Sequence, residues 1–268
     1  MDLRLWVVDL GPHRPDPTVW WPLLDPVERA QAGVEAERRV GDGARYVIRH
    51  AVLRTILGDA LGLAPAAVRL DRAPCPLCGG PHGRPIVADG AAAFSLASTP
   101  DVVAVAVAVG PAAVEVGLDV ATFGRSGGDD LAAALHPRER AALDRRPPGE
   151  RHLAALRCRT RKEALLKGRG TPPAAGSVDP AGVHVGLAPP AVDGPGGRMT
   201  TTAASAGWTL VDLPPVPLVT DRCVVVSLAY RADRRVKVDV VETGFSGLMR
   251  GREPPPVEVR TSHRSGVG

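Results

Sequence analysis

The sequence predicts an α+β protein built from two similar halves, each of which places helices before strands. Apolar residues recur with helical spacing at 26–40 and 44–61, and strand patterns follow them, ending in an alternating run at 102–109. The same order returns later, with helical spacing between residues 130 and 167 and strand patterns after it. Because helices and strands are grouped and do not alternate, we expect two α/β halves related by a pseudo-two-fold axis rather than a parallel βαβ sheet.

The expected helices are defined by the spacing of apolar residues and by their end signals. They cover residues 26–40, 44–61, 130–135, 137–143 and 150–167. The segment 44–61 is the clearest, because Tyr46, His50 and several aliphatic residues share one of its faces. Gly62 follows directly and is expected to end this helix as a C-cap.

The expected strands are short and rich in β-branched residues. They cover residues 3–10, 68–70, 86–87, 102–109, 115–121, 183–185, 208–213 and 224–230. The strand at 102–109 reads VVAVAVAV, and an alternation of valine with alanine is typical of a strand packed between two layers. We expect the segment 115–121 to be its hairpin partner.

The chain is divided on these grounds into an N-terminal half at 1–116, a C-terminal half at 117–232 and a tail at 233–268. The tail is polar, basic and rich in proline, with the run EPPPVEV near its middle. Segments of this composition bury too little apolar surface to offset the entropy of folding. We therefore expect the tail to be largely disordered.

The composition of the chain excludes several functional classes. Hydrophobic residues make up 44% and charged residues 23%, as in ordinary soluble proteins. The net charge of +4 favours acidic partners such as phosphates, but no stripe of basic residues with interleaved aromatics predicts a nucleic-acid interface. The longest apolar run, 102–109, is far shorter than the ~20 residues of a membrane span. Without secretory signal features or a disulfide-rich pattern, we expect a cytoplasmic protein.

The segment RKEALLKGRG at 161–170 contains two of the three lysines in a chain with 33 basic residues. Glu163 and Lys167 share a helix face, and Lys162 is offset from Glu163 by about 100°. One interpretation is a surface ion pair worth ~0.3–0.5 kcal/mol. The other is a carboxylate that holds a metal beside a lysine that contacts a phosphate. Asp119, at the end of an apolar strand, either caps the next element or supplies a second carboxylate for Mg²⁺.

The loop CPLCGGPH at 75–82 has the spacing of a zinc knuckle for two of its ligands, Cys75 and Cys78, with His82 within reach. A structural zinc site requires four ligands, and no second pair with this spacing follows. We therefore favour a reduced cysteine pair that stabilises the loop, with zinc binding as the alternative.

Six motifs, taken in order, resemble those of the Sfp-type 4'-phosphopantetheinyl transferases. They are LRLWVVDL at 3–10, RYVIRHAVLR at 45–54, HGRPIV at 82–87, FSLAST at 94–99, GLDVA at 117–121 and RKEALLK at 161–167. The resemblance covers residues 1–232, and the last two motifs are the most diagnostic. It implies the two-half fold of this family, a monomer, and transfer of 4'-phosphopantetheine from coenzyme A to a serine of an acyl or peptidyl carrier protein, as in polyketide or nonribosomal peptide biosynthesis.

The resemblance also implies the roles of individual residues. Asp119 and Glu163 would hold Mg²⁺ against the pyrophosphate of coenzyme A, and Glu163, or a water on the metal, would accept the proton of the carrier serine. Lys167 would stabilise the departing adenosine 3',5'-bisphosphate, with Lys162 close to the same phosphates. The residues expected to bind coenzyme A are Arg45, Arg49, Arg84, Ser98 and Thr99.

Three positions depart from the family pattern. Ala121 occupies the place of a second acid in the motif GxDxE, and Arg159 replaces a tryptophan before the Lys-Glu pair. Ser98 replaces a histidine that contacts a coenzyme A phosphate in the family, so the hydrogen-bonding group remains but its charge is lost. These departures favour an alternative hypothesis, a divergent homologue without transferase activity that binds a carrier protein or its thioester for another step.

Overall fold

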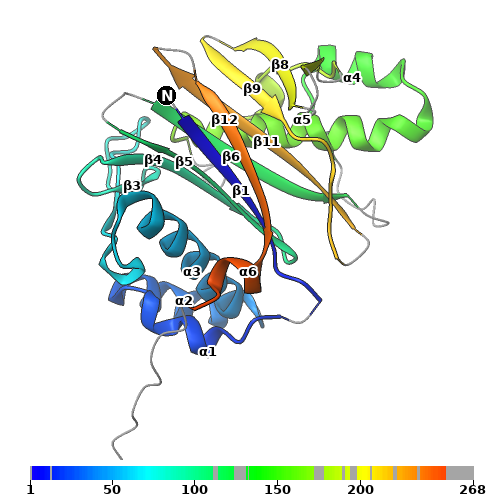
Figure 1. Ribbon diagram of the computed structural model, residues 1–268. Coiled ribbons are helices and arrows are strands. Elements are labelled where there is room, and N and C mark those ends of the chain that lie inside the picture. The colour runs from blue at the N-terminus through cyan, green and yellow to red at the C-terminus, as the bar shows by residue number, and fades with distance from the viewer. Residues whose placement is uncertain are drawn as a thin grey trace, which may run out of the picture.

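A computed structural model of the protein has the α+β architecture that the sequence predicts (Figure 1). The structure describes residues 2–12, 14–110, 114–123, 131, 133–171, 178–188, 191–193, 198–205, 207–219, 222–233 and 236–251. In this part of the chain two sheets share an apolar interior, and helices pack on the opposite face of each sheet. None of the described helices is long and apolar enough to cross a membrane.

The first sheet has the strand order β12-β1-β5-β4. Its strands are β1 (Asp2–Asp9), β4 (Ala92–Ser98), β5 (Val102–Val109) and β12 (Lys237–Gly244). β1 pairs antiparallel with β5 on one side and parallel with β12 on the other, so the two ends of the described chain lie side by side in this sheet. A separate hairpin of β2 (Leu70–Arg72) and β3 (Pro85–Val87) holds the cysteine loop between its strands.

The second sheet is built from the strands between residues 114 and 232. They are β6 (Val114–Phe123), β7 (Ala191–Asp193), β8 (Arg198–Ser205), β9 (Trp208–Asp212), β10 (Val216–Pro217) and β11 (Cys223–Ala232). β6 pairs with β11 along its whole length, so our expectation that it forms a hairpin with β5 is wrong. β5 and β6 each turn one apolar face toward the interior between the sheets, and they therefore face each other across it.

The helices α1 to α3 and α6 belong to the first sheet, and α4 and α5 to the second (Figure 1). They are α1 (Pro17–Trp20), α2 (Pro26–Arg38), α3 (Asp42–Leu61), α4 (Pro137–Asp144), α5 (Pro148–Gly168) and α6 (Phe245–Met249). Short 3₁₀ helices occupy Trp21–Leu23, Pro65–Ala67 and Pro180–Gly182. α3 ends at Gly62, whose φ of +69° confirms the expected C-cap.

The alternation of valine and alanine in β5 follows from the position of this strand between the helices and the second sheet. Val103, Val105 and Val107 pack in the cluster formed with α3, whereas Ala104 and Ala106 face the second sheet. Large side chains therefore fill the space beneath the helices, and small ones let the two sheets approach. The prediction of a strand between two layers is confirmed.

The backbones of α5 and the second sheet approach closely at Gly117 of β6. A Cβ atom at Gly117 would lie 1.9 Å from the carbonyl oxygen of Ala164 and 2.3 Å from the backbone nitrogen of Gly168. A Cβ atom at Gly168 would in turn meet the Trp208 ring at 2.5 Å. Only glycine fits at either position, and the resulting approach places the last turns of α5 directly beside Asp119.

The expectation of a disordered tail is wrong for residues 236–251. β12 adds a strand to the first sheet, with Val238 buried, and α6 packs Phe245 and Met249 into the core beneath that sheet. The Phe245 ring meets Trp20 edge-on, with their centroids 5.5 Å apart. The polar, basic and proline-rich composition of residues 233–268 predicted disorder, and the short valine pattern at 237–244 did not change that prediction. Residues 252–268 lie outside the described part of the chain.

Two further expected elements are absent from the residues that the structure describes. Residues 131 and 133–135, part of the helix expected at 130–135, form turns. The strand expected at 183–185 does not pair with a neighbour, because the Val185 N–H donates to a carboxylate oxygen of Glu139 at 2.7 Å. A side chain thus satisfies the backbone group that a strand partner would have used.

The packing of α6 predicts that this segment contributes to stability. Replacing Phe245 by alanine should lower the free energy of unfolding by about 3–5 kcal/mol, because it empties a buried aromatic site against Trp20. Urea denaturation followed by circular dichroism measures this loss. Val241→Ala, at a half-exposed position of β12, is the control and should change stability by less than about 1 kcal/mol. Equal stability of the Phe245 variant and the wild type would contradict the observed packing.

Candidate functional site

A cavity of about 580 Å³ opens where the first sheet and its helices meet the C-terminal end of α5. Its walls come from α2, α3, the β2–β3 hairpin, β4, β6 and the C-terminal end of α5. Four of the predicted site residues line it: Arg49, Arg84, Ser98 and Lys167. Three of these side chains are cationic, so the cavity is suited to an anionic ligand. Arg84 also lines an adjoining cavity of about 520 Å³.

Lys167 connects this cavity to the two predicted metal ligands. Its Nζ atom donates to Oδ1 of Asp119 at 2.6 Å, and the lysine side chain remains 30% exposed. Glu163 lies one turn earlier on the same face of α5. The ion pair therefore forms between the helix and β6, and not along the helix as the surface-pair interpretation assumed.

Glu163 and Asp119 are close enough to interact as like charges. Burial raises the pKa of Glu163, and the negative charge of Asp119 raises it further. Lys167 and Arg159, which flank Glu163 along the helix, act in the opposite direction without cancelling the rise. Two hard oxygen ligands with excess negative charge are a donor set that fits Mg²⁺.

Lys162 faces away from this site, and its predicted place beside the phosphates is wrong. The side chain is 1% exposed and forms an ion pair with Glu139 at 2.6 Å. Its Nζ atom also donates to the carbonyl oxygens of Ala134 and Pro180 at 2.7 and 2.9 Å. These three acceptors match the three protons of the ammonium group. Lys162 is therefore a structural residue that connects α5 to α4 and to the 3₁₀ helix Pro180–Gly182.

A hydrogen bond to the C-terminal end of α5 fixes the position of the Arg84 side chain. Its Nη1 atom donates to the carbonyl oxygen of Gly168 at 2.8 Å, so the guanidinium meets one of the last carbonyl groups of the helix. This contact holds the hairpin of the first half against the helix of the second. Arg84 lines both of the adjoining cavities.

Two of the residues expected to bind coenzyme A do not line the cavity. Arg45 forms an ion pair with Asp42 in the first turn of α3. The hydroxyl of Thr99 accepts a hydrogen bond from the Asp101 N–H at 3.2 Å within the β4–β5 turn. The structure therefore brings together Arg49, Arg84 and Ser98 but leaves Arg45 and Thr99 outside the lining.

Tyr46 and His50 also line the cavity, and the sequence interpretation assigned both to the apolar face of a helix. Their rings stack with centroids 4.0 Å apart and planes 11° apart, and the guanidinium of Arg49 lies 4.7 Å from the Tyr46 centroid. Burial raises the pKa of Tyr46 to about 12 and lowers that of His50, so both rings are neutral at pH 7. The i, i+3, i+4 spacing of these three residues was visible in the sequence, but nothing in it distinguished a cavity wall from a core.

A buried cluster of charged residues holds His50 in its place in the cavity wall. Arg54 is fully buried and donates to Glu28 and to Asp25, at 2.6 Å in each case. Glu28 also shares a hydrogen bond of 2.8 Å with Nδ1 of His50. Burial alone would raise the pKa of Glu28, but the hydrogen bonds of His50 and Arg54 and the charge of Arg54 outweigh it and hold the pKa below its ordinary value. His50 is thus fixed in orientation beside Tyr46.

The three positions that differ from the motifs of the resemblance, Ala121, Arg159 and Ser98, have distinct surroundings. Ala121 is 4% exposed in an apolar cluster with Leu131, Leu156 and other residues, so a carboxylate at this position would enter an apolar site. Arg159 places a positive charge next to Glu163. Ser98 is exposed at the cavity wall.

Comparison of the chain with protein-family models and with curated proteins found no match. The assignment of the site therefore rests on the chemistry and geometry of its residues.

The surroundings of Lys162 predict a structural and not a catalytic effect of its removal. Lys162→Met should lower the free energy of unfolding by about 3–5 kcal/mol, because it leaves Glu139 buried without its counter-ion. Lys237→Met removes an exposed ion pair and should change stability by less than about 1 kcal/mol. Urea denaturation of both variants measures the difference, and similar values for the two would contradict the structural role.

The raised pKa of Glu163 predicts a pH-dependent stability. A carboxyl whose folded-state pKa lies above its ordinary value of 4.5 destabilises the fold once it is ionised, so its contribution worsens as pH rises through the folded-state pKa. Glu163→Gln should therefore melt higher than the wild type at pH 7 in EDTA, by about 2–4 °C for each kcal/mol gained. The difference should shrink below pH 4.5. The exposed Glu37→Gln is the control, and an equal rise in that variant would contradict the assignment.

Proposed function

We propose that this protein transfers 4'-phosphopantetheine from coenzyme A to a serine of an acyl or peptidyl carrier protein. The observation that supports this most strongly is the cationic cavity whose Lys167 is paired with Asp119 next to Glu163. Phosphoryl transfer depends mainly on positioning and on charge neutralisation, and this arrangement offers both cations and a pair of carboxylates.

Arg84, Arg49 and Lys167 are proposed to bind the phosphates of coenzyme A. Arg84 presents a planar guanidinium already fixed by the Gly168 carbonyl, and such a group binds phosphate in a defined orientation. Lys167 provides a compact charge at the end of the cavity nearest Asp119. Ser98 offers a hydroxyl at the wall as a neutral hydrogen-bond donor. The flat pair of Tyr46 and His50 offers a neutral surface for an aromatic base.

Asp119 and Glu163 are proposed to hold Mg²⁺, which would neutralise the charge on the pyrophosphate oxygens. Glu163 is also proposed to accept the proton of the carrier serine. Glu163 lies one helical turn before Lys167 and close enough to Asp119 to interact with its charge, so it is placed to serve as this base. Ala121 leaves the site with two carboxylates, which is sufficient for a magnesium ion completed by water and substrate.

The pseudo-two-fold relation of the halves is part of the same proposal. Strands of the N-terminal half together with β12 form one sheet of the shared interior, and the strands from β6 to β11 form the other. One long helix, α3 or α5, packs on the outer face of each sheet. The cavity lies between the halves, as expected if the two were adapted to bind one ligand. The monomeric state and the cytoplasmic location stay predictions.

Intact-mass spectrometry of an apo carrier protein tests the proposal. Incubation with this protein, coenzyme A and Mg²⁺ should add the mass of one phosphopantetheine, and EDTA should prevent the addition. Asp119→Asn should lower the rate by about 100-fold or more, since even the outer partners of a metal ligand are worth about 10–100-fold. Asp144→Asn, at an exposed position at the end of α4, is the matched control and should keep the wild-type rate.

The divergent non-transferase homologue is the second candidate function. It is favoured by Arg159, whose positive charge already offsets part of the charge that a metal would neutralise at Glu163. Isothermal titration with coenzyme A distinguishes the two. Binding of coenzyme A without transfer to any of several carrier proteins, while a known transferase modifies them, would overturn the transferase proposal and favour this alternative.

A further inference from the structure

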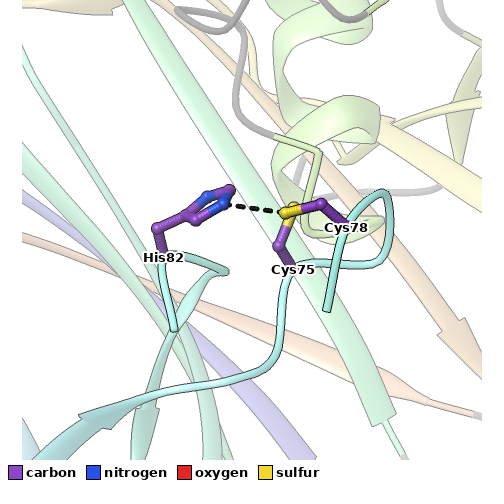
Figure 2. A group of neighbouring side chains, drawn as sticks. All are labelled: Cys75, Cys78 and His82. Carbon is purple, nitrogen blue, oxygen red and sulfur yellow. Dashed lines mark hydrogen bonds between the residues drawn. The ribbon is translucent and has the colours of Figure 1, made fainter. Parts of the chain in front are cut away.

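The loop between β2 and β3 folds into a compact turn around two sulfur atoms (Figure 2). The Cys75 N–H donates to the Gly80 carbonyl oxygen at 2.8 Å, and the Gly79 N–H donates back to the Cys75 carbonyl oxygen at 2.8 Å. Gly79, directly after Cys78, has a φ of +73°, a conformation that glycine adopts without strain. A Cβ atom at Gly80 would lie 3.1 Å from the His82 ring and 3.4 Å from the Cys78 sulfur.

Three potential metal ligands of this loop converge on one point. The Sγ atoms of Cys75 and Cys78 and a ring nitrogen of His82 all lie within 4.8 Å of one another. The Cys78 Sγ atom and His82 Nε2 are 3.0 Å apart and share a hydrogen bond, so both already point to the same place (Figure 2). Tetrahedral zinc with ordinary bond lengths separates such ligand atoms by about 3.5–3.8 Å, which small rotations of these side chains would provide.

The backbone of the turn also contacts the sulfur of the first ligand, Cys75. The backbone groups of Leu77 and Cys78 hydrogen-bond to the Cys75 side chain. Backbone donors directed at a sulfur stabilise a thiolate, and the thiolate is the form that binds a metal. This geometry depends on the loop alone and not on any bound ion.

We infer that Cys75, Cys78 and His82 form a binding site for Zn²⁺ or a metal of similar softness. Two thiolates and one imidazole are ligands that zinc prefers over harder ions such as magnesium. Among the residues that the structure describes, no further histidine, cysteine or carboxylate joins the group. Cys78 and His82 are exposed, so a water molecule can complete the tetrahedron from solvent.

The position of the loop indicates what the metal would do. The residues that follow it, from His82 to Arg84, form part of the wall of the central cavity. The hairpin is held on its other side by the Ala73 N–H, which donates to the Arg84 carbonyl oxygen at 3.0 Å. A metal joined to three points of the loop would therefore stiffen the segment that presents Arg84 to the ligand. The metal site itself does not depend on the transferase proposal.

Metal analysis of the tag-free, full-length chain tests this inference. The chain is reconstituted with zinc under reducing conditions and separated from free metal by gel filtration. Inductively coupled plasma mass spectrometry should then find about one zinc per chain. Cys78→Ser and His82→Ala change exposed side chains and should each reduce the zinc content to less than about a tenth of that value, as removal of a ligand predicts. Cys223→Ser changes a cysteine outside the loop and should retain the metal.

Cobalt substitution provides a second readout that reports on the ligands. The Co²⁺ form of the wild type should show a sulfur-to-cobalt charge-transfer band and the intense visible bands of tetrahedral coordination, and Cys78→Ser should weaken both. Wild-type chain without zinc or cobalt after reduction would overturn the inference, as would equal metal content in the Cys78 and His82 variants. Isolation of a stable Cys75–Cys78 disulfide that resists mild reduction would also overturn it.

Discussion

The arrangement of the whole site depends on how closely α5 lies against β6. At Gly117 the strand has no side chain, and the backbone of the helix at Ala164 and Gly168 occupies the space that a Cβ atom would need. This contact brings Lys167 within 2.6 Å of Asp119 and allows Asp119 to influence the pKa of Glu163. The carbonyl group of Gly168, at the same end of the helix, receives Arg84 from the other half. The close contact between the backbones of β6 and α5 thus brings Asp119, Lys167 and Arg84 to the same end of the helix.

Buried ion pairs determine the rotation of α5 about its axis. Arg161 donates twice to one carboxylate oxygen of Asp212, at 2.9 and 2.6 Å, and Lys162 pairs with Glu139 on the neighbouring α4. Because successive residues of a helix are offset by about 100°, these anchors turn Glu163 toward β6. An uncompensated buried charge would cost several kcal/mol, so the helix has little freedom to rotate. The residues around Glu163 therefore position it without touching the cavity.

The charge balance around Asp119 and Glu163 is set in part by their neighbours Ala121 and Arg159. Ala121 follows Asp119 on the same face of β6 and packs in an apolar cluster, where an additional carboxylate would have no solvent. Arg159 and Lys167 flank Glu163 and offset part of the negative charge that remains. Ala121 on β6 adds no acid to the pair, and Arg159 on α5 adds a cation beside it. Both features reduce the charge that a metal ion would have to neutralise.

The sequence by itself determined the α+β class, the long helices and the layered position of β5, because these follow from local spacing of apolar residues. It also identified Asp119, Glu163 and Lys167 as candidates, although only their residue types and order were visible. Tertiary structure decided which of two adjacent residues faces the site: Lys162 is buried against Glu139, and Glu163 faces Asp119. It also decided that β6 pairs with β11 and that β12 completes the first sheet. Pairing partners and the burial of a charge depend on residues distant in the chain, and local patterns carry no information about which distant residues meet.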